Sequence, residues 1–361
     1  MASSKQLELI ANDTKEWGTF KDSLKAPVHR WFTYPAGFSF KAVEHSFQKY
    51  GVTQGDWVYD PFMGSGTTNL TAKTCGVNSV GFEAHPFVFD ITKSKLNWNV
   101  SENVVMNFCD QIDEVLVRKK SQQEFVLSDH FPELVTKCYT EDTLRDLLIL
   151  REAFFAENFA VNERLFIKTG ITSLLRSISS AATGWPYIAP KKLKVTSSDK
   201  NVADEFIKLM KSMLSDLDEI KFISSGRESN TKHNLILGSS QNIKKYVANE
   251  SIDHIFTSPP YLNNFDYSDR TRLELYFWGE AKNWGDISKN VRTKLMTSAT
   301  TQIHRSNERY NVSDLLYEEA PHVAKFVERA KNELAELRKT KGGKKSYDLM
   351  EMGTYVFKVD P

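Results

Sequence analysis

The feature that most constrains this chain is a glycine turn between a short apolar run and a helical segment, within residues 56–83 (DWVYDPFMGSGTTNLTAKTCGVNSVGFE). The pattern predicts a strand over Trp57–Asp60, a helix from Thr67 to about Cys75 and a second strand over Ser79–Glu83. Strand, glycine loop, helix and strand in this order begin a right-handed parallel α/β unit. The sequence therefore predicts an α/β fold built on a parallel sheet.

Composition excludes several other classes of protein. The 361 residues hold 47 Lys and Arg against 46 Asp and Glu, so a site for a polyanion must be a local patch. No run approaches the roughly 18 apolar residues that a membrane-spanning helix needs, and the N-terminal residues contain no apolar secretory region. Three scattered cysteines favour neither a disulfide framework nor a zinc cluster. We therefore expect a cytoplasmic protein without a metal site or a membrane partner.

The pattern of predicted helices and strands changes twice along the chain. Residues 1–100 contain an N-terminal helix and the glycine-turn unit, while 101–232 are predicted to be a mostly helical insertion. Strand patterns return in 233–361: an apolar strand in HNLILGSS, a helix over 241–250, a buried strand in DHIFTSP and then a helical tail. We expect three units with these boundaries, the insertion lying between the cofactor half and the catalytic half of one sheet.

The residues of the glycine turn also indicate a ligand-binding site. Two glycines spaced by one residue, Gly64 and Gly66, let the backbone pass close to a ligand, and the helix behind them offers free N–H groups. Glu83 ends the second strand, where an acidic residue accepts hydrogen bonds from ribose hydroxyls in nucleotide-binding folds. The alternative is a tight structural turn. A phosphate-binding P-loop is excluded, because no lysine follows the second glycine.

A second motif, Thr257-Ser258-Pro259-Pro260-Tyr261, ends the predicted buried strand. Two prolines stiffen the backbone and remove two N–H donors. A serine oxygen and a proline carbonyl can then accept hydrogen bonds from an amino group, while the adjoining tyrosine offers a stacking face. By itself this string is also typical of a proline-stiffened strand exit.

Together, DPFMGSGTT and TSPPY resemble the motifs of the DNA methyltransferases that methylate exocyclic amino groups with S-adenosylmethionine. The resemblance covers roughly 30–100 and 233–280, and HRWFTYPAGF and GFEAHPFVFDITKSKLNW look like further segments of that family. It implies a Rossmann-like class I methyltransferase sheet and a base flipped out of duplex DNA. The catalytic residues that it implies are Ser258, Pro259, Pro260 and Tyr261. The cofactor-binding residues that it implies are Tyr34, Pro35, Asp60, Phe62, Gly64, Gly66, Thr67, Glu83, Pro86 and Ser239. Ser239 departs from the family pattern, in which an acidic residue is customary.

The resemblance favours cytosine-N4 as the target, because serine rather than aspartate begins the tetrapeptide at Ser258. Adenine-N6 methylation, methylation of an RNA amino group and an inactive DNA-binding remnant are the alternatives. The family normally has seven strands in the order 3-2-1-4-5-7-6, whereas the sequence offers four and one more near 354–359. We therefore expect a C-terminally truncated sheet, as either a fragment or one half of a split enzyme that a second chain completes; a cognate restriction endonuclease is the alternative partner.

Basic residues of the middle region and of the segment after Tyr261 are the candidates for binding double-stranded DNA. They are Arg176, Lys191, Lys192, Lys194, Arg270 and Arg272. The alternatives are a solvated basic loop for the first four, and ion pairs with Asp266, Asp269 or Glu274 at helical spacing for the last two.

Overall fold

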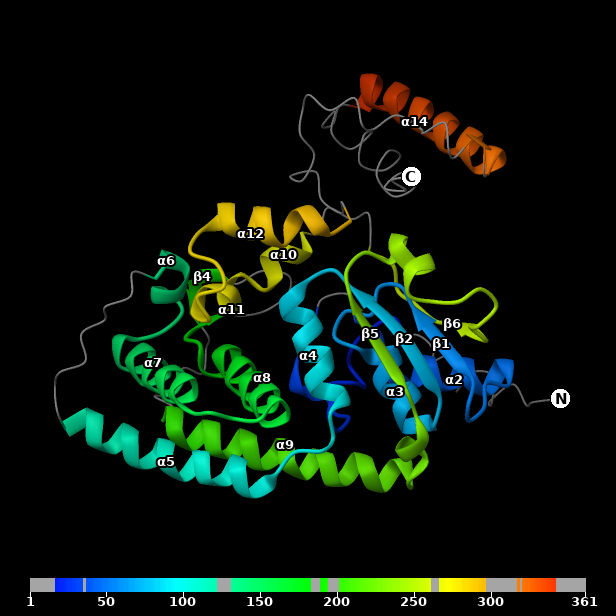
Figure 1. The fold of residues 1–361 in the computed structure, drawn as a ribbon. Coiled ribbons are helices and arrows are strands. Elements are labelled where there is room, and N and C mark those ends of the chain that lie inside the picture. Colours follow the sequence, from blue (N-terminus) through cyan, green and yellow to red (C-terminus); the bar gives the residue numbers. More distant parts are fainter. Residues whose placement is uncertain are drawn as a thin grey trace, which may run out of the picture.

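The computed structural model describes residues 17–34, 37–121, 131–182, 189–193, 201–260, 266–296, 317–318 and 320–341. It contains a parallel sheet in the order β5-β2-β1-β6, drawn in Figure 1. Its strands are β1 (Trp57–Asp60), β2 (Asn78–Glu83), β5 (His233–Leu237) and β6 (His254–Ile255). All the carboxyl ends therefore meet at one edge, and the predicted parallel α/β arrangement is confirmed.

The strand β6 differs from its prediction. A buried strand was expected in DHIFTSP, but regular pairing is limited to His254 and Ile255, opposite Val58 and Tyr59 of β1. Ile255 is 61% exposed, so the expected burial is wrong. The described residues provide β6 with a pairing partner on the β1 side only, which leaves its side chains less covered than those of β1.

Three helices frame the glycine-turn unit: α2 (Phe40–Tyr50), α3 (Thr67–Cys75) and α4 (Pro86–Leu96). The α2 helix ends at Gly51, whose φ of 69° suits a residue without a side chain. Alternation along β1 sends Val58 to the face covered by α2 and α3, and Tyr59 to the opposite face beside Phe82. The two inner strands, β1 and β2, are therefore apolar and covered on both faces.

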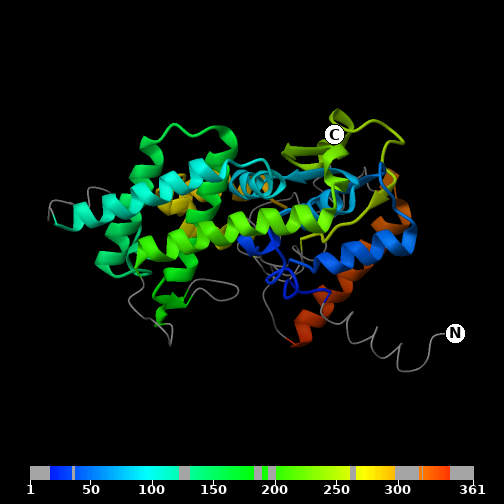
Figure 2. The same cartoon turned by 90° about the horizontal axis from the view of Figure 1, so that it is seen from below.

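The middle region is mostly helical, as predicted. It contains α5 (Glu102–Ser121), α6 (Glu133–Thr136), α7 (Glu141–Ala156), α8 (Val161–Ile178) and α9 (Val202–Ser224), with a small antiparallel pair of β3 (Ala181–Ala182) and β4 (Ala189–Leu193). One apolar core runs from Trp31 and Phe87 into these helices. The long helix α9 packs against α5 and α8 and reaches α3 (Figures 1 and 2). The helical region thus shares its core with the part of the chain that carries the sheet.

The remaining elements are short except for one. They are η1 (His29–Trp31), η2 (Arg227–Asn230), η3 (Ser240–Lys245), α10 (Tyr267–Arg270), α11 (Arg272–Phe277), α12 (Trp284–Asn290), η4 (Arg292–Lys294) and α14 (Pro321–Lys341). The helix predicted over 241–250 is thus only a 3-10 helix, while the predicted strand near 354–359 lies outside the described residues. Within the described ranges, every helix is too short or too polar to cross a bilayer.

Candidate functional site

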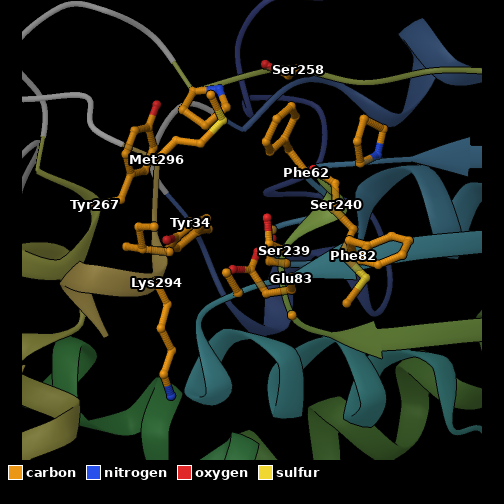
Figure 3. A pocket seen from close by; sticks show the side chains of 18 of the residues that line it. Tyr34, Phe62, Phe82, Glu83, Ser239, Ser240, Ser258, Tyr267, Lys294 and Met296 are labelled. Atoms are coloured by element: carbon orange, nitrogen blue, oxygen red, sulfur yellow. The ribbon is translucent and has the colours of Figure 1, made fainter. Parts of the chain in front are cut away.

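A cleft opens at the carboxyl edge of the sheet, where β1, β2 and β5 end (Figure 3). It holds about 920 Å³ of space, counting its open mouth. The sequence-predicted residues that line it are Tyr34, Phe62, Gly64, Thr67, Glu83, Ser239, Ser258 and Pro260. The glycine turn and the proline-stiffened strand end therefore form walls of one cleft, as a single active site requires.

The glycine turn brings backbone to the cleft surface. Gly64 has φ of 51°, and a Cβ atom there would lie 3.3 Å from Tyr34 Cδ1. Gly66 has φ of 83°, and its Cβ atom would meet Thr92 Cγ2 at 2.6 Å. Thr92 also donates a hydrogen bond to the Gly64 carbonyl at 2.7 Å. Both glycines are therefore required by conformation and by the close approach of neighbours.

Glu83 supplies the acidic group of the cleft. Its side chain lies at the end of β2 between Tyr34 and Phe82 in Figure 3, and the residue is only 8% exposed. Burial raises the pKa of this carboxyl to about 7, although hydrogen bonds from the His85 and Gly64 amides favour the ionised form. The His85 amide donates to Oε1 at 2.8 Å. The carboxylate is positioned to accept hydrogen bonds from hydroxyl groups of a bound ligand.

Asp60 lies behind the wall of the cleft. It is fully buried, and its Oδ1 accepts hydrogen bonds from Thr257 Oγ1 at 2.7 Å and from the Phe62 amide at 3.0 Å. Burial raises the pKa of this carboxyl to about 6 against the effect of these bonds. Asp60 thus connects the glycine turn to the Ser258 strand end, and its role in cofactor binding stays a prediction.

Tyr34 forms another wall of the cleft, and the chain just before it accepts hydrogen bonds from a side chain of α4. The buried Lys95 of α4 donates hydrogen bonds to the carbonyls of His29 and Phe32, each at 3.0 Å. The Tyr34 ring lies 6.3 Å from that of Tyr267, measured between centroids. Burial raises the pKa of Tyr34 well above its usual value, so the phenol stays neutral.

Several predicted residues take other positions. Gly66 caps α3, Pro86 is the first residue of α4, and Pro259 is exposed beside the cleft. Pro35 and Tyr261 lie outside the described residues. Sequence reasoning missed Tyr267, Lys294, Leu295 and Met296, which also line the cleft. Only the folded chain brings them back to the glycine turn, and no local motif marks them.

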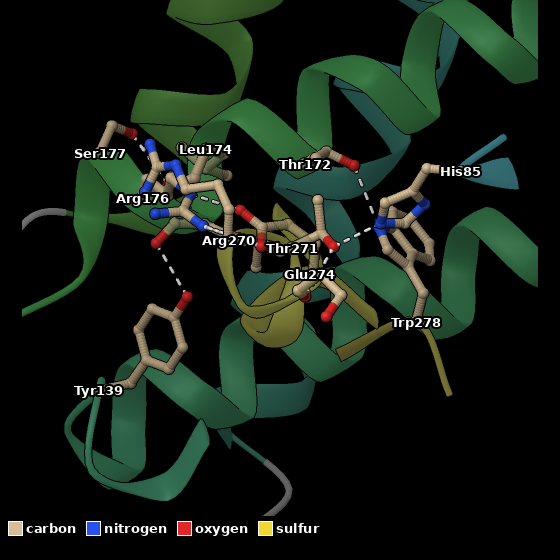
Figure 4. Close-up of polar contacts among 12 residues, drawn as sticks. His85, Tyr139, Thr172, Leu174, Arg176, Ser177, Arg270, Thr271, Glu274 and Trp278 are labelled. Carbon is tan, nitrogen blue, oxygen red and sulfur yellow. Dashed lines mark hydrogen bonds and ion pairs between the residues drawn. The ribbon is translucent and has the colours of Figure 1, made fainter. Parts of the chain in front are cut away.

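The predicted DNA-facing arginines do not form a surface patch. Arg176 is ion-paired with the buried Glu274 and also donates to the carbonyl of Arg270, as Figure 4 shows. Arg270 is 8% exposed, and Arg272 pairs with Asp269 at 3.1 Å, the helical pair named as the alternative. Arg176 and Arg272 thus have carboxylate partners, and Arg270 is buried, while the role of all three in DNA binding stays a prediction.

The three lysine candidates belong to or follow the short strand β4. Lys191 and Lys192 belong to β4, whereas Lys194 lies outside the described residues. Their role in DNA binding stays a prediction.

The sequence was compared with known proteins. Residues 10–94 match the family described as DNA methylase, N6_N4_Mtase. The type II methyltransferase M.BsoBI of Geobacillus stearothermophilus is 27% identical over 282 residues, which cover 70% of this chain and 53% of the relative. M.AvaI of Anabaena variabilis is 23% identical over 72% of this chain and 56% of its own length. M.MjaII of Methanocaldococcus jannaschii is 41% identical over 69 residues, 19% of this chain and 13% of the relative.

These matches and the parallel sheet with its cleft point to one class: the chain is similar to the amino-methyltransferases. Members of this family use S-adenosylmethionine as the methyl donor. The chain spans about half the length of the first curated relatives it matches. No solved structure gave a significant match.

Proposed function

We propose that this chain is a DNA methyltransferase that transfers a methyl group from S-adenosylmethionine to the exocyclic amino group of a flipped base, with cytosine-N4 as the favoured target. The observation that carries the proposal is the shared cleft. Gly64, Glu83 and Ser258, far apart in sequence, line the same space. Relatives named as type II methyltransferases support DNA as the substrate.

The residues present fit the methyl donor. Glu83 offers a carboxylate to ribose hydroxyls, and its pKa of about 7 allows ionisation at neutral pH. Gly64 leaves room for a ligand beside Tyr34, because a side chain at this position would crowd the ring. Ser239 stands where the family has an acidic residue, and its hydroxyl, which accepts a hydrogen bond from the Gln241 amide at 3.3 Å, faces the same cleft. When bound, S-adenosylmethionine supplies a methyl group carried on a positively charged sulfur.

The strand end is suited to an amino group. An exocyclic amine is a weak nucleophile because its lone pair is delocalised into the base. Hydrogen bonds from the amine to Ser258 Oγ and to the Pro259 carbonyl would direct that lone pair toward the methyl group. Most of the rate acceleration then comes from positioning. As the new N–C bond forms, the electron pair of the broken C–S bond stays on sulfur and the amine releases one proton. Tyr261 is proposed to stack on the base.

The decisive experiment measures the product. The full chain is incubated with S-adenosylmethionine carrying a labelled methyl group and with duplex DNA, and the digested nucleosides are analysed by mass spectrometry. N4-methylcytosine supports the full proposal, whereas N6-methyladenine supports the class and overturns the base choice. Label in transfer RNA but not in DNA overturns the DNA proposal.

A matched variant tests the site. We expect Ser258→Ala to lower kcat by about 10–100-fold, since one hydrogen bond to a developing charge is lost. Its affinity for the methyl donor, measured by titration calorimetry, stays within about twofold of that of the wild type, because Ser258 acts on the base. An equal loss in both measurements would show that Ser258 is needed for structure instead.

The names of the relatives also support a role in restriction–modification, with a cognate endonuclease as partner. DNA isolated from cells that express the chain is then expected to resist an endonuclease that cuts at the modified sequence. Ordinary cleavage of DNA that carries the modified base at that sequence would contradict this role.

A further inference from the structure

A second cavity lies beside the cleft, on the other side of the segment that carries Tyr34. Counted in the same way as the cleft, with its open mouth, it also holds about 920 Å³ of space. Thr33 lines this cavity whereas Tyr34 lines the cleft, and Arg270 lines this cavity whereas Tyr267, one helical turn earlier, lines the cleft. The described residues around the second cavity include three arginines and four hydroxyl side chains: Arg30, Arg176, Arg270, Thr33, Thr172, Ser173 and Ser177.

Arg270 is the unusual member of this group. The residue is 8% exposed, and its Nε and Nη1 atoms are buried without a hydrogen-bond partner among the described residues. Burial and the neighbouring Arg176 lower the pKa of Arg270 to about 10, which still leaves the guanidinium charged at neutral pH. A buried charge with unsatisfied donors is strongly unfavourable unless a partner is supplied.

The other two arginines of the cavity already have carboxylate partners. Arg30 Nε donates to Asp216 Oδ2 at 2.9 Å. Arg176 contacts both carboxylate oxygens of Glu274, which is fully buried, through Nε and through Nη2 at 3.0 Å (Figure 4). One carboxylate, Glu274, thus serves the two guanidinium groups of Arg176 and Arg270. Among the described residues, the group therefore holds three guanidinium charges against the carboxylates of Asp216 and Glu274, next to an open cavity.

We infer that this cavity binds a phosphate group through Arg270. A guanidinium presents a planar set of donors that matches phosphate oxygens, and the hydroxyls of Thr33 and Ser173 add donors on the cavity wall. The exposed Thr33 and Ser177 connect the cavity to solvent, so a ligand can enter the folded protein. The phosphate compensates the buried charge of Arg270, whose Nε and Nη1 have no partner in the described part of the chain.

The position of the cavity indicates the source of the phosphate. It adjoins the cleft proposed to receive the flipped base, so a backbone phosphate of the DNA strand carrying that base is the ligand that fits best. This part of the inference rests on the proposed function. A free phosphate ion or a phosphorylated metabolite has the same chemistry and is the other source to be distinguished.

The first test uses inorganic phosphate as the probe. The full chain and the variants Arg270→Met and Lys208→Gln are titrated by calorimetry at constant ionic strength. Lys208 is an exposed lysine of α9 that does not line the cavity, so its variant controls for the loss of one positive charge. We expect Arg270→Met to weaken phosphate binding by about tenfold or more and Lys208→Gln to leave it unchanged.

The second test uses duplex DNA. Affinity is measured by fluorescence anisotropy between about 50 and 200 mM salt, and the slope of log K against log salt is compared. If the strand supplies the phosphate, Arg270→Met reduces that slope by about one and Lys208→Gln does not. Phosphate binding lost in Arg270→Met together with an unchanged DNA slope identifies a free phosphate instead. Unchanged phosphate binding together with an unchanged slope overturns the inference.

Two further measurements keep the outcomes separate. If Arg270→Met fails to fold, Arg270→Lys retains the charge but loses the planar fork, and weaker phosphate binding than in the wild type is expected from it. Binding of S-adenosylmethionine is titrated in parallel. If the chain binds phosphate but neither the methyl donor nor DNA, the anion site is supported and the proposed function is overturned.

Discussion

Thr257 Oγ1 donates a hydrogen bond to Asp60 Oδ1 over 2.7 Å, and this bond joins the ends of two neighbouring parallel strands. Asp60 precedes the glycine turn, and Thr257 precedes the Ser258 strand end. This part-buried bond fixes the two motifs that define the cleft to each other, together with the bond from Thr68 Oγ1 to the Phe256 carbonyl at 3.4 Å. Relative motion of the walls requires that these bonds be broken.

Thr257→Val tests this connection. The variant keeps the shape of the side chain but leaves Asp60 Oδ1 without this donor. We expect the free energy of unfolding in urea to fall by about 1–2 kcal/mol, because a buried carboxylate oxygen loses one of its two donors and keeps the Phe62 amide. Thr257→Ser retains the hydroxyl and should recover most of the loss. Equal stabilities of the Val and Ser variants would contradict the role of this hydrogen bond.

The pH dependence of stability tests the environment of Glu83. The folded-state pKa of its carboxyl is raised from 4.5 to about 7, so the folded chain holds a proton that the unfolded chain releases over this interval. Glutamine imitates the protonated form at every pH. The stability of Glu83→Gln relative to the wild type should therefore increase by up to about 3 kcal/mol as pH rises from 4.5 to above 7.

Binding of the methyl donor should show the opposite trend. The ionised carboxyl of Glu83 accepts hydrogen bonds better, so wild-type affinity is expected to rise between pH 5.5 and 7.5 by about tenfold. Titration calorimetry at both pH values measures this change, and Glu83→Gln should show a smaller one. A parallel pH response in both proteins would assign the effect to another group.

Gly66→Ala tests the close approach at the turn. A Cβ atom would lie 2.6 Å from Thr92 Cγ2 on a backbone with φ of 83°. We expect a loss of about 3 kcal/mol in unfolding free energy, from backbone strain and overpacking together. The matched control is Gly51→Ala, where φ is 69° and no atom lies within 4 Å, so only about 1 kcal/mol is expected. Thr92→Ser, which removes Cγ2, should restore part of the Gly66→Ala loss.

Lys95→Met tests the support of the Tyr34 wall. Burial lowers the pKa of Lys95 from 10.5 to about 7, so the unfolded chain binds more protons between these values. The stability of the wild type relative to the variant should therefore rise as pH increases from about 7 to 10.5. Affinity for the methyl donor should fall in the variant, because the carbonyls of His29 and Phe32 lose their donor. Equal pH profiles of the two proteins would contradict a buried, titrating Lys95.

Local signals were enough to predict the glycine turn, the strand that ends at Glu83 and the helix from Thr67 to Cys75. Each depends on residues within one turn or one strand of each other. The burial of Arg176 was not predictable in this way, because its partner Glu274 is 98 residues away in the sequence. A basic residue looks the same in sequence whether it meets solvent or a buried carboxylate.

The same difference between local and long-range signals explains which residues of the cleft could be predicted. Ser258 and Gly64 were placed in one cleft because the carboxyl ends of parallel strands meet at one edge. Lys294 and Met296 reach the cleft through a chain reversal after α12, and no residue pattern encodes that return. The extent of β6 was overestimated for a related reason, since an apolar run does not reveal whether neighbours cover it.

Asp216 of α9 accepts hydrogen bonds from the Val28 amide, from Arg30 and from Trp31 Nε1, so the helical region anchors the chain just before Tyr34. Evolutionary exchange of the helical region between related proteins would thus carry a constraint at its boundary. A transplanted helix without an acidic residue at position 216 would leave the Val28 amide, Arg30 and Trp31 Nε1 without their acceptor. Chimeras should work only when residues 28–31 and 202–224 are inherited from the same parent.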